Sequence, residues 1–304
     1  MVRKILNKQT NTDNQMKEMT LKDAVEFTFR HRHEWIHGKA VETHRINCGH
    51  FLRIIGPETP VEMVRPLSFN LLKEELLNEE WCKGKKRTPG GVNRILAALS
   101  TVLNECYKNE LVTRKPAYTR CKENKNARAR YYSEEEMKAL YAAALSLPEN
   151  GQLLHDSIRF SYYTGDRLGE LLKLQWSEVN FEDREITFLN TKSGSNHRIH
   201  MPSALVEMLK DRFHHRVCDR VFPWEGSRLG ADLMRRHFRK AQTIAGISHD
   251  RCIHSIRHTT GTHLISKGVN VRTVMGVLNH SNINTTLRYA ANQDKTVADA
   301  IELL

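Results

Sequence analysis

Apolar residues in the first third of the chain recur with the spacing of amphipathic helices. The pattern predicts one helix that begins near Thr20 and three more over roughly 39–55, 66–78 and 91–111. Thr20 and Asp23 form a capping-box pattern, and Gly56-Pro57 ends the second helix. We therefore expect a polar arm over residues 1–19, followed by a small all-helical domain over residues 20–112.

Residues 113–130 interrupt this pattern with seven positive side chains, one negative side chain and few apolar residues. This composition predicts an extended linker. It is compatible with a solvated connector and with a strap along a phosphate backbone, and the basic charge favours the strap. The basic residues are Arg114, Lys115, Arg120, Lys122, Lys125, Arg128 and Arg130.

A second domain is predicted over residues 131–304. Ser133-x-x-Glu136 is another capping-box pattern, and helices should follow over about 134–147 and 151–163. The β-favouring segments 185–189 and 197–201 flank a turn and predict a hairpin, after which helices dominate. The expected fold class is mainly α, with a small helical domain before a mostly helical domain that holds a small antiparallel sheet.

The composition is ordinary for a globular protein, but the charge is not. Lys and Arg number 47 against 35 Asp and Glu, a net charge of +12, which suggests a polyanionic partner. No apolar run reaches the roughly 18 residues of a membrane span, and the polar N-terminus predicts a cytoplasmic protein. The six scattered cysteines favour neither disulfides nor a thiolate zinc site.

One motif suggests a different class of enzyme. His33-Glu34-Trp35-Ile36-His37 matches H-E-x-x-H, in which two imidazoles one helical turn apart bind zinc. The longer metalloprotease pattern requires Gly and His where Ala40 and Thr43 stand. We therefore favour a chance match on an exposed helix end, and expect no metal site.

Four segments of the second domain carry candidate chemistry. They are Thr164-Gly165-Asp166-Arg167-Leu168-Gly169-Glu170, the turn at Thr191-Lys192, His254-Ser255-Ile256-Arg257, and the run from Leu278 to Tyr289 that contains His280. Each alone has an ordinary explanation: a structural Arg–Glu pair, a solvated turn lysine, a mixed surface helix and a packed tyrosine. A cation beside an imidazole also suits a phosphodiester, because one neutralises charge and the other moves protons.

In this order and spacing the segments resemble the tyrosine recombinase (phage integrase) family. Lys192 follows Arg167 by 25 residues and Tyr289 follows His280 by nine, as in the family pattern. Two positions depart from it: Asn279 stands where Gly is common, and Ala291 where His or Lys is frequent. Asn tolerates a left-handed backbone better than most residues, so we expect the turn to survive.

The resemblance implies a mechanism without metal or cofactor, in which bond energy is stored in a covalent intermediate. Tyr289 attacks the scissile phosphorus and leaves a 3′-phosphotyrosyl link. Arg167 and Arg257 bind the non-bridging oxygens, and His280 donates a further hydrogen bond. Lys192 protonates the leaving 5′-oxygen, His254 assists proton removal from Tyr289, and Glu170 orients His254 or Arg167.

The resemblance also implies partners. The first domain is expected to be the family's core-binding (SAM-like) domain, and double-stranded DNA the substrate. The candidate contacts are Lys83, Lys85, Lys86, Arg87, Asn93, Arg94, Arg120, Lys122, Lys125, Arg128 and Arg130. The tail after Tyr289 either covers its own core or docks on a neighbouring protomer in a tetramer that passes through a Holliday junction, and accessory DNA-bending or directionality factors are further candidate partners.

The implied role is integration or excision of a phage or mobile element in a bacterial cytoplasm. A Xer-like chromosome or plasmid dimer resolvase and a type IB topoisomerase stay open as alternatives. The small first domain and short tail favour a recombinase over a topoisomerase. A DNA-binding regulator with an inactive site is disfavoured, because all six catalytic positions are filled.

Overall fold

Two separate cores organise the chain, one within residues 1–126 and one within residues 127–304. The computed structural model describes residues 19–38, 40–82, 84–123, 131–189, 196–224 and 227–290. We call the two parts unit 1 and unit 2 and describe each by itself. The predicted arm up to residue 18 and the tail after residue 290 lie outside the described residues.

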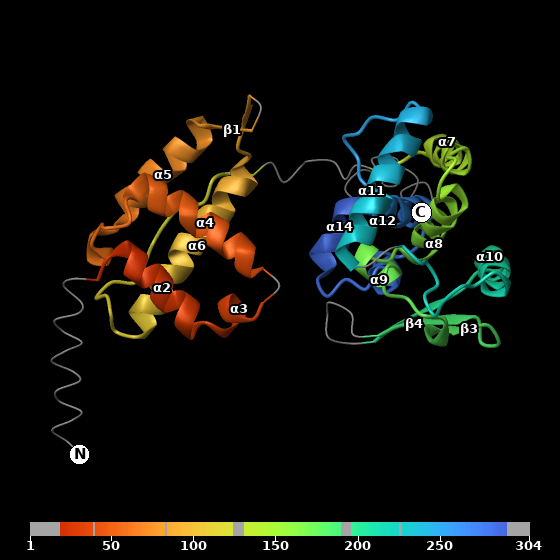
Figure 1. Cartoon of the computed structure of the whole chain (residues 1–304), viewed down its shortest axis with the longest axis horizontal. Helices are drawn as coiled ribbons and strands as arrows, with labels where there is room; N and C mark the ends of the chain where they lie inside the picture. The colour runs from red at the N-terminus through yellow and green to blue at the C-terminus, as the bar shows by residue number, and fades with distance from the viewer. Residues whose placement is uncertain are drawn as a thin grey trace, which may run out of the picture. The chain divides into compact units, whose positions relative to one another are not determined.

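Unit 1 is a bundle built around its longest described helix, α6. This helix contacts α2, α4 and α5 (Figure 1), and its Leu96 and Leu99 are fully buried. The predicted capping box is confirmed, because Thr20 and Asp23 exchange hydrogen bonds at the start of α2. The helices are α2 (Leu21–His31), α3 (His33–Ile36), α4 (Val41–Ile55), η1 (Val61–Met63), α5 (Pro66–Asn78) and α6 (Pro89–Lys108).

The expectation of an all-helical first domain was wrong in one detail. Strand β1 (Glu80–Cys82) pairs antiparallel with β2 (Lys85–Lys86) between α5 and α6. Gly84 lies between them at φ +75, a left-handed conformation that glycine adopts without strain. Strands this short carry too few residues to show an alternating pattern, so periodicity could not indicate them.

The first part of the predicted linker packs on unit 1. The ring of Tyr118 stacks on Phe69 with 4.9 Å between centroids. Asn93 on α6 donates a hydrogen bond to the carbonyl of Cys121 and accepts one from its amide, at 3.1 and 2.8 Å. Residues up to Glu123 are thus held against unit 1, and 124–130 lie outside the described residues.

Unit 2 is mostly helical. Helix α8 contacts α7, α10, α11 and α12, and the predicted capping box of Ser133 and Glu136 at the start of α7 is confirmed. The helices are α7 (Glu134–Leu145), α8 (Gly151–Thr164), α9 (Leu168–Leu171), η2 (Trp176–Glu178), α10 (Ser203–His214), α11 (Ser227–Ile244), α12 (His254–Ser266), α13 (Val271–Val277) and α14 (Ile283–Ala290).

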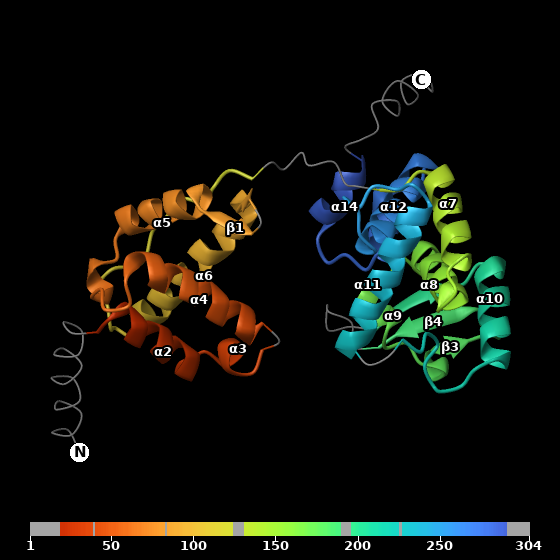
Figure 2. The same cartoon turned by 45° about the horizontal axis from the view of Figure 1, so that its top comes forward.

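A three-stranded antiparallel sheet lies at the edge of unit 2 away from α14 (Figure 2). The predicted hairpin is confirmed as β4 (Glu185–Phe188) paired with β5 (His197–His200), with Ile186 opposite Ile199. The third strand, β3 (Val179–Asn180), has only two residues and was not predicted. The hairpin turn, which includes Lys192, lies outside the described residues.

Among the residues that the structure describes, no helix combines the length and the apolar character that a membrane span requires.

Candidate active site

The first motif ends one helix and begins another. Helix α8 stops at Thr164, and Gly165 follows in the left-handed conformation at φ +61. A Cβ atom at Gly165 would lie 2.4 Å from a methyl carbon of Leu278, so glycine is required by both backbone and space. The chain then turns into α9, with Arg167 as the residue that precedes its first turn.

Arg257 on α12 connects the segment that begins at Thr164 with the segment that begins at Leu278. Its side chain is buried, with 4% of the residue exposed. It donates one hydrogen bond to the carbonyl of Gly165 at 2.6 Å and another to the carbonyl of Leu278. Burial, followed by the nearby charge of Arg167, lowers its pKa to about 10, so it remains a cation at neutral pH.

Arg167 lies over the same turn. Its guanidinium donates to the carboxylate of Glu170 at 2.8 Å and to the carbonyl of Asn279 at 3.1 Å. Glu170 also accepts the Arg167 backbone amide at 2.9 Å, so it holds this arginine rather than His254. Asn279 adopts φ +46, which confirms that asparagine supports the left-handed turn. The two arginines therefore bind the carbonyls of consecutive residues, 278 and 279.

His280 follows directly on that turn. Its Nδ1 atom lies 2.9 Å from the hydroxyl of Thr286, which is fully buried on α14. Burial, together with Arg257 and Arg167, lowers the pKa of His280 to about 4, so the ring is neutral at neutral pH. If Thr286 donates to Nδ1, Nε2 carries the proton and can donate to an anion.

Tyr289 is buried inside unit 2, with 1% of the residue exposed. Burial raises the pKa of its hydroxyl, and Arg257 and Arg288 oppose that shift. The hydroxyl lies 2.8 Å from Nδ1 of His258, on the facing helix α12. The ring lies over Gly261, where a Cβ atom would come within 2.7 Å of it.

His254 lies one turn before His258 on α12. The two rings meet edge to face with 5.1 Å between centroids. Burial of the imidazole and the charges of Arg257 and Arg167 lower the pKa of His254. The predicted pairing of His254 with Tyr289 is not recorded among the described residues, in which the tyrosine hydroxyl meets His258 instead.

Five of the six predicted catalytic residues thus gather around the turn at 278–280, while Lys192 lies outside the described residues. Sequence reasoning missed His258 and Thr286. His258 directly follows the H-x-x-R motif, and its four-residue step from His254 was a usable helical signal. Thr286 carried no local signal, because threonine is common in helices of mixed polarity.

A broad hollow opens beside His280. It has a volume of about 810 Å³, and its lining includes His197, Arg272, Asn279 and His280. The turn that carries His280 therefore borders open space, into which a phosphate group could enter.

The predicted DNA contacts of unit 1 and of the linker to unit 2 fall into three groups. Lys85, Lys86, Arg94, Arg120 and Lys122 are exposed. Two others are engaged within the protein: Arg87 donates to Glu79 at 2.9 Å, and Asn93 holds the Cys121 segment. The third group lies outside the described residues: Lys83, Lys125, Arg128 and Arg130.

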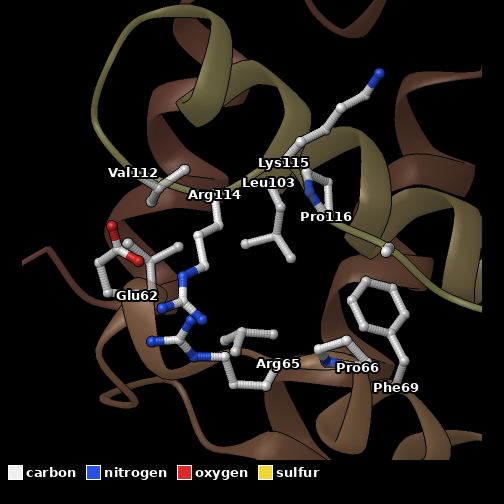
Figure 3. A pocket seen from close by; sticks show the side chains of 12 residues that line it. Glu62, Arg65, Pro66, Phe69, Leu103, Val112, Arg114, Lys115 and Pro116 are labelled. Atoms are coloured by element: carbon white, nitrogen blue, oxygen red, sulfur yellow. The ribbon is translucent and has the colours of Figure 1, made fainter.

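Unit 1 also contains a largely apolar pocket, with two arginines at one end, that the sequence did not indicate (Figure 3). Its volume is about 180 Å³, and the guanidinium groups of Arg65 and Arg114 point to the same end of it, near Glu62. One terminal nitrogen of Arg65 is buried without a hydrogen-bond acceptor. An anion at this end would satisfy that donor.

The H-E-x-x-H segment lies on the short helix α3. The rings of His33 and His37 are 5.0 Å apart between centroids, and Glu34 lies 3.4 Å from Arg32. Within the described ranges no group of three or more His, Cys, Asp or Glu side chains is placed to hold a metal ion.

Known proteins resemble the chain in sequence. The model of the phage integrase family matches residues 130–296. A tyrosine recombinase of Thermosipho africanus is 27% identical over 176 residues, which cover 57% of this chain and 61% of the relative. The tyrosine recombinase XerC of Chlamydia trachomatis is 26% identical over 243 residues, which cover 74% of each protein. The first three curated relatives are covered over only 53–61% of their length.

Solved structures share the fold at low sequence identity. The integrase of transposon Tn1549, solved with circular intermediate DNA, has a TM-score of 0.77 at 16% identity and covers 94% of this chain and 100% of that one. A lambda integrase dimer bound to a core site has a TM-score of 0.74 at 19% identity, over 94% and 81% of the two chains. The matched region spans more than half of the sequence and contains all the segments gathered around Tyr289, and the chain therefore belongs to the phage integrase family of tyrosine recombinases.

Proposed function

We propose that this chain is a site-specific DNA recombinase that cuts and rejoins DNA through a 3′-phosphotyrosyl intermediate, and that it integrates or excises a phage or mobile element. The observation that carries this proposal is the grouping of Arg167, Arg257, His280 and Tyr289 around one turn. Two cations and a neutral imidazole donor match the charge and oxygens of a phosphodiester.

The proposed roles follow from this grouping. Arg167 and Arg257 bind the non-bridging oxygens, since a planar guanidinium bonds oxygens in pairs. His280 donates from Nε2 while Thr286 fixes its other nitrogen. Lys192, from the hairpin turn, protonates the leaving 5′-oxygen. Tyr289 is the nucleophile, and the covalent link conserves the energy needed for rejoining without a cofactor.

DNA binding is proposed for the basic side chains of both units. In unit 1 the exposed Lys85, Lys86, Arg94, Arg120 and Lys122 suit phosphate contacts, and Arg65 with Arg114 add a further anion position. Arg87 and Asn93 act instead by shaping unit 1, because their polar groups are already bonded within the protein.

The proposed assembly is a tetramer that holds two duplexes. The support is by likeness alone: lambda integrase has been solved as a tetramer bound to a Holliday junction, with a TM-score of 0.71 to this chain. A tail beyond residue 290 that docks on a neighbouring protomer belongs to the same proposal.

A covalent trap tests the activity. The chain is incubated with a library of nicked duplexes from which the cleaved end diffuses away, and the DNA bound to protein is sequenced. We expect recovery of a defined site by the wild-type chain and none by Tyr289→Phe. Full recombination by Tyr289→Phe would contradict the mechanism.

The second candidate role is a Xer-like dimer resolvase, which several relatives named XerC favour. The recovered site separates the two roles: sequences from the ends of a mobile element support integration, and a single chromosomal site supports resolution. Efficient relaxation of supercoiled DNA that lacks this site would instead indicate a topoisomerase.

A further inference from the structure

We propose that His258 accepts the proton of Tyr289 when the tyrosine attacks DNA. This inference rests on the proposed function and changes the role first expected for His254. It starts from the hydrogen bond of 2.8 Å between His258 Nδ1 and the Tyr289 hydroxyl. A proton acceptor must lie within hydrogen-bonding reach of the proton it takes, and His258 meets that condition.

The direction of this hydrogen bond follows from burial. The Tyr289 hydroxyl lies within unit 2, and His258 Nδ1 is the one hydrogen-bond partner recorded for it among the described residues. A buried hydroxyl proton needs an acceptor, so the tyrosine donates and the imidazole accepts. His258 then carries its own proton on Nε2.

The surroundings keep His258 neutral before DNA binds. Burial, followed by the charges of His254, Arg257 and Arg288, lowers its pKa to about 4. The groups that face it come from three places: His254 and Arg257 on α12, Arg288 and Tyr289 on α14, and His280 from the turn before α14. A neutral ring is free to accept a proton at neutral pH.

Binding of a phosphodiester would make His258 a stronger base. A phosphate held by Arg167 and Arg257 brings a negative charge that opposes the cations acting on this ring. Imidazolium is then favoured at the moment when the tyrosine must lose its proton. The free protein thus holds Tyr289 as a neutral hydroxyl, and the substrate itself completes the basic site.

The step balances as follows. The O–H bond of Tyr289 breaks, its proton passes to His258 Nδ1, and the oxygen forms a bond to phosphorus. The bond from phosphorus to the 5′-oxygen breaks, and this oxygen takes a proton from Lys192. In rejoining, the 5′-hydroxyl gives its proton back to the neutral Lys192 amine as its oxygen bonds to phosphorus. The bond from phosphorus to the tyrosine oxygen breaks, and the His258 imidazolium returns its proton to that oxygen.

Helix packing maintains the pair. Tyr289 lies on α14, which contacts α12 (Figure 2), and Gly261 leaves room for its ring one turn beyond His258. His254 lies edge to face against His258, so the imidazole contacts both a neighbouring ring and the tyrosine hydroxyl. No comparable contact joins His254 to Tyr289 among the described residues, which is why the base is assigned to His258.

Two substitutions separate hydrogen bonding from proton transfer. His258→Asn keeps an acceptor oxygen at about the position of Nδ1 but removes the base, and His258→Phe removes both. The matched control is His263→Asn: it lies on the same helix, and its Nδ1 also meets a tyrosine hydroxyl, that of Tyr162 at 3.0 Å, outside the site. Thermal melting and binding to uncut duplex establish that each variant is folded.

The measurement is the single-turnover rate of tyrosine–DNA bond formation as a function of pH, on the duplex captured by the wild-type chain. We expect His258→Asn and His258→Phe to react about 10²–10³-fold more slowly at neutral pH. In His258→Asn hydroxide must replace the base, so its rate should rise about tenfold per pH unit between about pH 6 and 9, while the wild-type rate stays nearly flat. His263→Asn should follow the wild type.

A second substrate separates the base from the acid. A duplex with sulfur at the bridging 5′ position releases a thiolate, which needs no proton. This substrate should rescue Lys192→Ala but not His258→Asn. Three results with His258→Asn would overturn the proposal: cleavage at the wild-type rate, an equal loss of activity at every pH, or rescue by the sulfur substrate. It would also be overturned if the cleavage rate became hydroxide-dependent in His254→Asn and not in His258→Asn. Failure of the wild-type chain to capture any duplex would instead contradict the proposed function.

Discussion

Asp166, next to Arg167, is a buried carboxyl group close to the site. One of its oxygens accepts a hydrogen bond from the Thr164 hydroxyl at 3.2 Å. Burial raises its pKa from 3.8 to about 7, although hydrogen bonds from Ser161 and Thr164 and the charge of Arg257 oppose this shift. The folded protein therefore holds this proton more tightly than the unfolded chain does.

The sign of the pH effect follows from linkage. The stabilising contribution of protonated Asp166 is fully present below the unfolded pKa near 3.8 and is lost as pH rises through about 7. We expect Asp166→Asn to unfold near the wild-type temperature at pH 4 and to be more stable at pH 8, by roughly 2–4 kcal/mol. Calorimetry at both pH values measures this. A loss of stability in Asp166→Asn at pH 8 would mean that the ionised carboxylate is paired with Arg257.

Thr286 is expected to act through His280. Thr286→Val keeps the shape of this buried side chain and removes the hydroxyl that meets Nδ1 of His280. The imidazole then loses its fixed tautomer, and we expect the cleavage rate to fall about 10–100-fold, as for other residues that orient a ligand. Thr286→Ser keeps the hydroxyl and should retain most activity, so equal losses in the two variants would argue against this role.

At the scale of elements, α12 determines where the nucleophile lies. One helix supplies His254, Arg257 and His258 within two turns, and Gly261 provides the flat surface for the ring of Tyr289. Glycine costs a helix interior about 1 kcal/mol relative to alanine, so its presence here reflects the close approach of α14.

Gly261→Ala should displace the tyrosine. The new Cβ atom would lie 2.7–2.8 Å from two ring carbons of Tyr289 and 3.0 Å from Leu278. We expect the clash to lower the free energy of unfolding by about 1–3 kcal/mol, an effect that the higher helix propensity of alanine partly offsets. The cleavage rate should fall more strongly than the affinity for DNA. Gly49→Ala on α4 is the control, because a Cβ there has no neighbour within 4 Å. Cleavage by Gly261→Ala at the wild-type rate would show that the buried position of Tyr289 is unimportant.

At the scale of the whole molecule, the net charge of +12 bears on affinity for DNA. Every phosphate contact releases counterions, so the logarithm of the binding constant falls with the logarithm of salt concentration by about 0.9 per contact. Neighbouring basic residues differ in their availability for phosphate contacts. Lys85 and Lys86 are exposed, whereas Arg87 is engaged by Glu79 within the protein.

We expect Lys85→Gln with Lys86→Gln to reduce the salt slope by about 1–2 and to leave thermal stability unchanged. Arg87→Gln should lower the thermal stability and leave the salt slope unchanged. The reason is that it removes the ion pair with Glu79 and the hydrogen bonds to His50. Fluorescence anisotropy over a range of salt concentrations, together with melting curves, measures both quantities. An unchanged slope in the double lysine variant would remove these residues from the DNA interface.

Prediction from sequence worked where the signal was local. Helix α5 matches its predicted limits, both capping boxes formed, and the hairpin of β4 and β5 was found, because each depends on residues a few positions apart. Strands β1 and β3 were missed because two or three residues show no period. Arg87 and Asn93 look like DNA contacts in sequence, and only packing shows that their polar groups are occupied.

The residue types and their order along the chain were enough to identify the side chains that could carry the chemistry, because both are properties of the sequence itself. Amphipathic spacing, a local property, likewise established the helical character of both units. The folded arrangement was needed to show which histidine meets Tyr289, and that Glu170 holds Arg167. The physical reason is that these contacts join α12, α14 and the turn at 278–280 through the packing of whole helices, and the spacing of residues within one helix does not determine which side chain of the next it touches.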